Sequence, residues 1–192
     1  MKFEIHINQN EICIDFKKIV NKYDVSINYD FVNEYQLMPS KFSIIPITKN
    51  NINSIDIRNL NIYGLTNKGF KLINNYLDID EKEFRKITKN KRFNKFNIKK
   101  VTKDIKNKNY SSKDMKFALY AYAYCYYIPY NNQNYSLYLS KKLNYSDAYI
   151  KNLTKELFSK KYLIKQGKGV PGGLFSSKLI KLFNSQEFQQ YL

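Results

Sequence analysis

The chain has 192 residues, of which 43% are hydrophobic, and it carries a formal net charge of +17. The length suits one domain or two small ones, and the apolar content is enough for a packed core, which excludes a disordered basic tail. The positive charge indicates a polyanionic partner, most often nucleic acid, with a membrane surface as the alternative.

The charge is unevenly distributed along the chain. Residues 1–81 hold 9 basic and 10 acidic groups and have a net charge of −1. Residues 82–113 have a net charge of +11, and residues 114–192 have one of +7. The first part is therefore close to neutral, and the surface that attracts a polyanion is expected in the second part.

Cysteine usage and hydropathy indicate the compartment. Cys13 and Cys125 both stand among apolar or aromatic residues, and two cysteines do not make a disulfide framework, so free thiols in a reducing compartment are expected. The first residues lack the hydrophobic segment of a signal peptide, and no apolar run reaches the length of a membrane span. We expect a cytoplasmic protein of a bacterial host cell, with no membrane partner.

The N-terminal part has the pattern of β-strands. Residues 2–7 (KFEIHI) and 11–16 (EICIDF) alternate between polar and apolar, with a polar turn between them, which predicts a β-hairpin. The β-branched and aromatic residues from 25 to 31 predict a further strand. Pro46 argues against an interior strand position for residues 43–47.

Helical signals follow the strands. Residues 53–60 have the pattern of a capped helical turn, Gly64 is expected to end it, and Thr66 is expected to cap a helix over about 67–77. Asp80 and Glu83 have the spacing of a capping box for a helix over about 81–89. The aromatic residues between the lysines of 82–113 suit either stacking on single-stranded bases or packing in a helical linker, and packing is favoured.

A long apolar helix begins the C-terminal part. Ser111 or Ser112 is expected to cap it, and it should run to about Ile128, where Pro129 ends it. Its run of tyrosines suits either base stacking or a buried core with hydroxyls reaching the surface, and the core is the commoner case.

Residues 135–183 contain four features in a fixed order. A short amphipathic helix carries Leu137, Leu139 and Leu143, and a polar turn follows at 144–146. A longer helix comes next, and then two short strands at 162–164 and 174–175 enclose a Gly/Lys loop. This order of helix, turn, helix and β-wing is that of a winged helix-turn-helix.

The longer helix has the pattern of a recognition helix. Ser146 is a suitable N-cap, and Ile150, Leu153 and Leu157 cluster on one side. The opposite side carries small, amide and basic residues of the kind that contact DNA bases, and the alternative is a solvated lysine-rich face. The candidate groove-facing residues are Ala148, Lys151, Asn152 and Lys155, flanked by Tyr149, and the candidate phosphate contacts are Lys141, Lys142, Lys165 and Lys168. Ser146, at the start of the helix, is a further candidate contact with nucleic acid.

The loop between the two short strands fits the pattern G-x-G-x-x-G at residues 167–172 (GKGVPG). That pattern binds dinucleotides only between a strand and a helix of a βαβ unit, with an acidic residue about 20 positions later, and neither condition holds here. A hairpin tip that lies along phosphates or in a minor groove is the favoured interpretation.

Sequence motifs of catalysis are missing. His6 is the only histidine, and a single histidine with no nearby carboxylate or cysteine cluster makes neither a catalytic dyad nor a metal site. Four acidic residues, Asp15, Asp24, Asp30 and Glu34, would have to converge to hold Mg²⁺ as in a nuclease, and their spacing does not indicate it. We expect no enzymatic activity, no catalytic residue, no metal ligand and no cofactor.

The C-terminal part resembles winged helix-turn-helix DNA-binding domains. The order of parts is similar to that of uncharacterised helix-turn-helix proteins of phages and bacterial mobile elements, in which a small β-containing region precedes a segment like INSIDIRNL (52–60) and a wing like GKGVPGG (167–173). Asn61 stands where that pattern has a proline. The resemblance covers most of the chain, is specific only over 135–183, and implies DNA binding.

Together these patterns predict an α+β chain with a small α+β domain over 1–80, a basic helical linker over 81–110 and a winged helix-turn-helix domain over 111–192. The expected function is sequence-specific binding of double-stranded DNA by a transcriptional regulator, with residues 1–80 mediating homodimerisation or contacts with a host protein. The alternatives are a protein-directed inhibitor or adaptor of the anti-defence type, and a replication or partition initiator.

Overall fold

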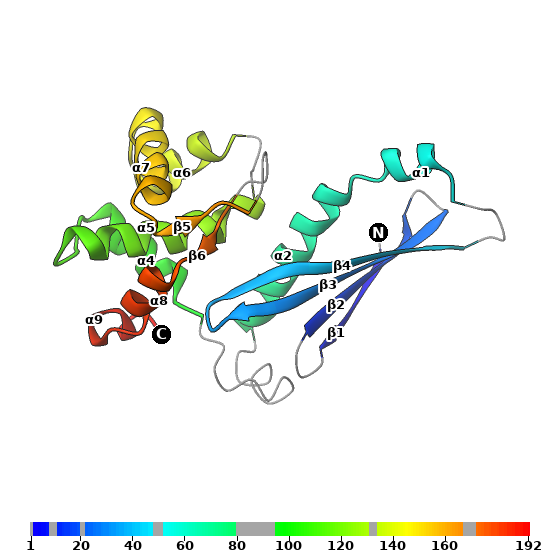
Figure 1. Ribbon diagram of the computed structural model, residues 1–192, viewed down its shortest axis with the longest axis horizontal. Helices are drawn as coiled ribbons and strands as arrows, with labels where there is room; N and C mark the ends of the chain where they lie inside the picture. Colours follow the sequence, from blue (N-terminus) through cyan, green and yellow to red (C-terminus); the bar gives the residue numbers. More distant parts are fainter. Residues whose placement is uncertain are drawn as a thin grey trace. The chain divides into compact units, whose positions relative to one another are not determined.

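The computed structural model describes residues 2–7, 11–19, 22–47, 52–79, 95–130, 134–166 and 172–192, and for residues 78 and 79 it describes the backbone alone. The chain forms two compact units, Met1–Phe93 and Asn94–Leu192. The fold is α+β, because an antiparallel sheet is followed by helices (Figure 1).

The first unit is built on a four-stranded antiparallel sheet in the order β1-β2-β3-β4. The strands are β1 (Lys2–Ile7), β2 (Glu11–Ile19), β3 (Tyr23–Asn33) and β4 (Gln36–Pro46). The expected N-terminal hairpin and the third strand are thus confirmed. Residues 43–46 belong to β4, an edge strand, where a proline does not interrupt a hydrogen-bonded ladder on both sides.

One face of this sheet is covered by helix α2 (Ile62–Ile79), which runs along it in Figure 1. Alternate residues of the two central strands are fully buried there, and Leu65, Ile73 and Leu77 of the helix join the same core. The residues between them point to the opposite face, because successive side chains of a strand alternate. That opposite face carries polar side chains.

The start of α2 differs from expectation. Gly64 and Thr66 were expected to end one segment and cap the next, but both lie inside the helix. Asn61 provides the cap instead, because its Oδ1 accepts the N–H of Gly64 at 2.8 Å, and the Thr66 hydroxyl donates to the Ile62 carbonyl at 2.9 Å. The preceding helix α1 (Ser54–Asn59) has the expected capping, from Asn53.

Gly69 is required in α2 by a close approach to the sheet. A Cβ at this position would overlap the Tyr29 hydroxyl and lie 2.8 Å from Cζ of the same side chain. Tyr29 is fully buried, and its hydroxyl donates to the Thr66 carbonyl. Gly69→Ala should therefore lower the free energy of unfolding by about 1–2 kcal/mol despite the better helix propensity of alanine. Urea unfolding measures it, and adding Tyr29→Phe should relieve part of the loss; equal losses with and without Tyr29→Phe would contradict the clash.

The second unit consists mainly of helices. They are α4 (Ile98–Lys106), α5 (Lys113–Tyr127), the 3-10 helix η1 (Ile128–Tyr130), α6 (Tyr135–Leu143), α7 (Asp147–Ser159), α8 (Ser177–Phe183) and α9 (Gln186–Gln189), with the strands β5 (Leu163–Ile164) and β6 (Leu174–Phe175). Ser112 caps α5 by accepting the N–H of Met115 at 3.1 Å, which confirms that helix start.

The expected linker over 81–110 is not a separate segment in its second half. Residues from 95 onward belong to the second unit, where Phe96, Val101 and Ile105 are buried. The Phe96 ring lies 5.1 Å from that of Tyr122 and 4.6 Å from that of Phe188. Aromatic packing therefore draws this basic stretch into a core. The expected helix over 81–89 lies outside the described residues.

The tyrosines of α5 form a core, as favoured from the sequence. Tyr120, Tyr122 and Tyr124 are at most 5% exposed, and the Tyr120 hydroxyl lies 2.8 Å from Oγ1 of Thr154 on α7.

Leu137 departs from expectation, because it is 43% exposed. Helix α6 instead buries the row that contains Leu139 and Leu143, together with the small residues Ser136 and Ser140. Within the described part of the chain, no helix has the length and apolarity needed to cross a bilayer.

Candidate nucleic-acid interface

A tight turn joins α6 to α7. Asn144 adopts a left-handed conformation (φ 59°) at the end of α6, which its short amide side chain tolerates better than most residues do. Ser146 then caps α7 by accepting the N–H of Tyr149 at 3.2 Å, as expected. Between them, the Tyr145 hydroxyl donates to the Ile105 carbonyl at 3.0 Å and anchors the turn to α4. The angle between the two helices is thus held by specific contacts.

The inner side of α7 is fixed in the core. Ile150, Leu153 and Leu157 are at most 3% exposed, which confirms the apolar side that the sequence indicated. Thr154 is also buried, and its hydroxyl bridges the Ile150 carbonyl and the Tyr120 hydroxyl. A helix whose outer side chains contact base edges has to be held in a fixed position, and packing of this kind provides that.

The outer side of α7 is exposed to solvent. Ala148, Lys151, Asn152 and Lys155 all lie there, and Tyr149 flanks them at 36% exposure. The Tyr149 ring lies against that of Tyr145 in a tilted arrangement, with 4.7 Å between the ring centres, and Nζ of Lys116 from α5 lies 5.1 Å from the centre of the Tyr149 ring. The structure therefore brings the sequence-derived groove residues onto one surface and adds Lys116, which sequence spacing alone did not connect to them.

Lys151, one of the candidate groove residues, forms an ion pair within α7. Lys151 Nζ lies 2.6 Å from Oδ2 of Asp147, one turn earlier. The hydrogen bond from Lys151 holds the pKa of Asp147 below its usual value, and the same contact raises the pKa of Lys151. Lys151 therefore stays protonated, but the Asp147 carboxylate offsets part of the positive charge that it presents to a ligand. The i,i+4 spacing of the two residues was the sequence signal that could have shown this pair.

Releasing Lys151 from this pair should strengthen binding to a polyanion. Asp147→Asn removes a negative charge beside the groove residues and keeps the side-chain shape, so we expect about 3- to 10-fold tighter binding to random duplex DNA at low salt. Fluorescence anisotropy at several salt concentrations measures it. Glu187→Gln, at an exposed position on α9, is the charge-matched control, and an equal gain in that variant would contradict a local effect.

The candidate phosphate contacts lie on separate elements of the second unit. Lys141 and Lys142 are exposed in the last turn of α6, and Lys165 is exposed directly after β5. Lys168 and most of the GKGVPG loop lie outside the described residues. The pairing of Leu163 with Phe175 shows that this loop joins two antiparallel strands, so it lacks the strand-to-helix setting that a dinucleotide site needs.

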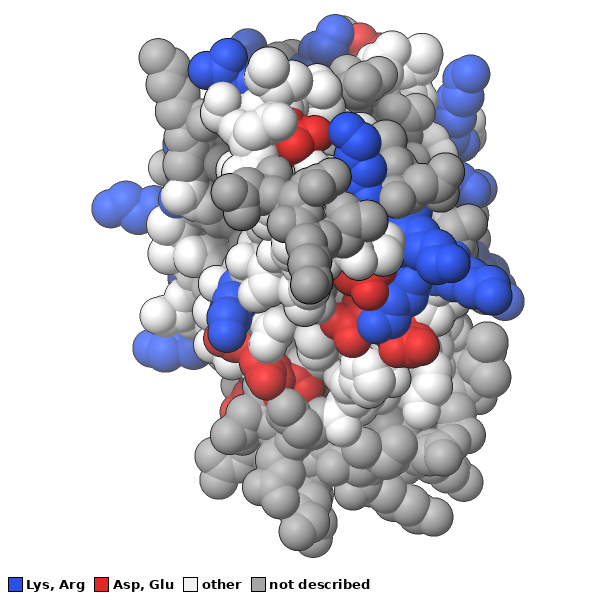
Figure 2. Space-filling view, turned by 90° about the vertical axis from the view of Figure 1, so that its right-hand side faces the viewer, with Lys and Arg blue, Asp and Glu red and all other residues white. Residues whose placement is uncertain are grey.

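The positive charge is concentrated in the second unit. Residues 94–192 hold 18 lysines and 5 acidic residues, which leaves a net charge of +13. This total includes four exposed lysines of α4, which are Lys99, Lys100, Lys103 and Lys106. On the face of the molecule that Figure 2 draws, by contrast, acidic and basic side chains are interspersed.

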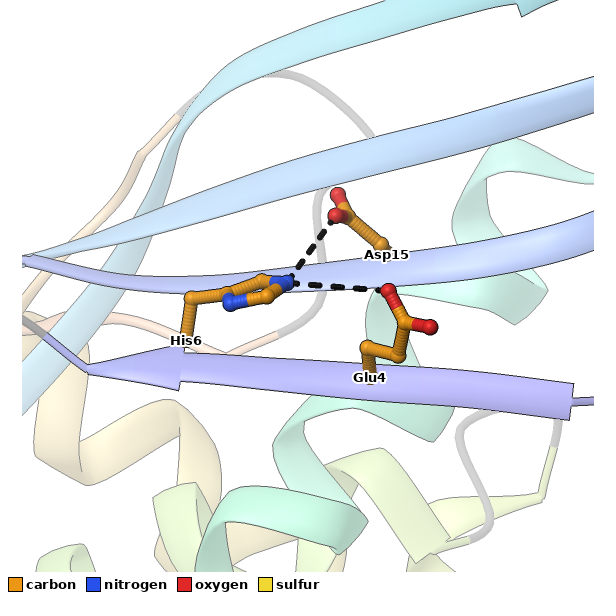
Figure 3. A group of neighbouring side chains, drawn as sticks. All are labelled: Glu4, His6 and Asp15. Carbon is orange, nitrogen blue, oxygen red and sulfur yellow. Dashed lines mark ion pairs between the residues drawn. The ribbon is translucent and has the colours of Figure 1, made fainter.

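The first unit contains a polar cluster that sequence reasoning missed. His6 was expected to have no carboxylate near it, but the structure contradicts this: its Nε2 lies 3.2 Å from Oδ2 of Asp15 and 3.8 Å from Oε2 of Glu4 (Figure 3). The antiparallel register of β1 and β2 brings them together. Asp15 is the one member of this cluster that was weighed as a Mg²⁺ ligand from the sequence. Within the described residues, Asp24, Asp30 and Glu34 are not part of the cluster.

The function of this chain has to be inferred from its residues and their geometry. Comparison of the chain with protein-family models, with curated proteins and with solved structures finds no match.

Proposed function

We propose that the chain is a sequence-specific double-stranded DNA-binding protein whose second unit acts as a winged helix-turn-helix domain. The observation that carries the proposal is the exposed side of α7, which presents Lys151, Asn152 and Lys155 from a helix fixed in the core directly after a tight turn. The β5–β6 hairpin follows that helix, as a wing follows a recognition helix.

Each exposed residue of α7 has a chemical role in this proposal. Asn152 can pair bidentately with adenine, and Lys151 and Lys155 can reach guanine or phosphate in the major groove. Ala148 is small enough to let the helix approach and to contact a thymine methyl group. Lys141, Lys142, Lys165 and Lys168 would hold the register by contacting phosphates, with Ser146 at the helix start.

The first unit has a different role in this proposal. Helix α1 buries none of its residues, and it exposes Ile55 (64%) and Ile57 (45%). Because α1 contributes no buried residue to the core of the first unit, its exposed isoleucines are suited to contacts with another protein or with a second copy of the chain. A dimer would place two α7 helices on paired half-sites, which is the usual arrangement of regulators of this class.

The experiment that tests the proposal is selection from random DNA duplexes with the purified full chain at about physiological salt, where non-specific binding is suppressed. Recovery of a sequence motif supports a regulator, and a palindrome would support a dimer and give the half-site spacing. Binding without a motif, fading steeply as salt rises, would overturn sequence-specific recognition. A recovered motif can then be located in genomic DNA. Regularly spaced copies at an origin of replication, instead of a site at a promoter, would identify an initiator.

A protein-directed role is the second candidate, and the exposed isoleucines of α1 favour it. In that case the chain would act as an inhibitor or adaptor on a nucleoprotein complex of the host. Nuclease treatment of a host lysate before affinity capture separates the two functions. Partners retained after nuclease treatment and lost in an Ile55→Ser, Ile57→Ser variant would support the protein-directed role, whereas partners lost with the nucleic acid would count against it.

A further inference from the structure

The outer face of the first unit's sheet carries two neighbouring cross-strand pairs of polar residues. Glu4 of β1 lies opposite Asp15 of β2, and His6 lies opposite Cys13. Because residues two apart on a strand share a face, and opposite residues have close Cβ atoms, these four side chains form one cluster. The cluster is in the first unit, so it is independent of the DNA-binding proposal.

The potential ligand atoms of this cluster are close enough together to meet on one metal ion after small side-chain rotations. One ligand atom each from Glu4, His6 and Asp15 lies within 4.8 Å of the other two, and the closest approach is 3.2 Å, between His6 Nε2 and Asp15 Oδ2 (Figure 3). Ligand atoms that surround zinc tetrahedrally at about 2.0–2.2 Å are roughly 3.3–3.6 Å apart. Glu4 and His6 are more than half exposed, so small rotations of their side chains can close the remaining gap.

We propose that Glu4, His6 and Asp15 form a binding site for a divalent transition-metal ion, of which Zn²⁺ fits best. An imidazole nitrogen with two carboxylates suits Zn²⁺, whereas Mg²⁺ prefers a shell of oxygen ligands and retains several waters. Three protein ligands leave one position for water or for a ligand from another molecule.

The neighbours of the cluster support this assignment. The Cys13 thiol donates to Oδ1 of Asp15 at 3.6 Å, which orients this carboxylate and leaves Oδ2 directed at His6. A contact that holds the unused oxygen of a ligand is a common feature of metal sites. The edge position of β1 keeps the cluster accessible to an ion from solution.

The ammonium group of Lys17 lies beside both carboxylates, so it competes with a metal ion for them. Its Nζ lies 3.4 Å from Oε2 of Glu4 and 3.9 Å from Oδ2 of Asp15. An ion bound by these carboxylates has to displace the ammonium group or share its charge, so removal of Lys17 should strengthen metal binding. If these residues formed ion pairs alone and bound no metal, removing Lys17 would not strengthen zinc binding.

The experiment is a calorimetric titration of the full, tag-free chain with zinc chloride, with the NMR signals of the His6 ring followed in parallel. Because His6 is the only histidine, those signals report on this site alone. We expect one saturable site per chain, weakened about tenfold or more in both His6→Ala and Asp15→Asn. Lys17→Gln should bind several-fold more tightly than the wild type.

The matched control is Asp30→Asn, which removes the same charge from an exposed position on β3 of the same sheet. It should leave zinc affinity unchanged. The proposal is overturned if the wild-type chain shows no saturable binding, if His6→Ala binds zinc as well as the wild type does, or if Asp30→Asn weakens binding as much as Asp15→Asn. Circular dichroism of each variant shows whether the fold is kept.

Discussion

Replacing both Lys151 and Asn152 with alanine should weaken binding to the selected duplex by about 30- to 1,000-fold. A good bidentate contact with a base contributes about 1–3 kcal/mol of discrimination, and a single lysine contact should contribute less. We therefore expect a loss of about 2–4 kcal/mol from the two side chains together, and about 1.4 kcal/mol corresponds to a tenfold change in affinity. Both side chains are exposed, so the fold should keep its stability. Anisotropy titrations with the selected duplex and with a scrambled duplex measure the effect.

The two duplexes distinguish recognition from charge. Loss of Asn152 should lower affinity for the selected duplex alone, whereas loss of Lys151 should lower affinity for both duplexes. The control is Asn67→Ala with Lys68→Ala, an adjacent pair of the same two residue types on α2, within the near-neutral stretch of residues 1–81. Unchanged affinity in the α7 variant, or an equal loss in the α2 variant, would contradict the assignment of α7 as recognition helix.

The largest stability effect is expected from Phe183→Ala in α8. This side chain is fully buried, and its ring centre lies 5.1 Å from that of Phe96, 5.2 Å from Phe175 and 4.7 Å from Phe188. Removing it leaves a cavity between elements that are far apart in sequence, which should lower the free energy of unfolding by about 3–5 kcal/mol. For a unit of this size, that is a large fraction of the total.

Urea unfolding followed by far-ultraviolet circular dichroism is the suitable measurement, because the chain contains no tryptophan and most of the helices that the structure describes belong to the second unit. Leu137→Ala serves as the control, since Leu137 is 43% exposed on α6. It should change the free energy of unfolding by less than about 0.5 kcal/mol. A cost for Phe183→Ala no greater than that of Leu137→Ala would contradict the packing described for this core.

Local patterns predicted several parts of the structure correctly. The alternation in residues 2–7 and 11–16 predicted the β1–β2 hairpin, and the hydroxyls of Ser112 and Ser146 marked the starts of α5 and α7. The spacing of the apolar residues predicted which side of α7 is buried. These features depend on residues a few positions apart, and local backbone preferences and side-chain periodicity are determined over that range.

Other local signals were overridden. Thr66 has the residue type of an N-cap, yet the apolar face of α2 continues through it because Leu65 packs on the sheet together with Ile73. In the basic stretch before α5, the charge suggested a linker, but Phe96 joined a cluster of aromatic rings from α5, α8 and α9. Burial of apolar surface outweighs a local preference worth about 1 kcal/mol.

The sequence by itself determined the α+β composition, the concentration of charge in the second half and the two faces of α7, because these follow from composition and from short-range periodicity. Only the tertiary structure decided that Lys116 lies over Tyr149, that Phe183 packs on Phe96, and that His6 meets Asp15. Each of these contacts joins residues from different elements. Their proximity depends on strand register and helix packing, which the whole core sets together.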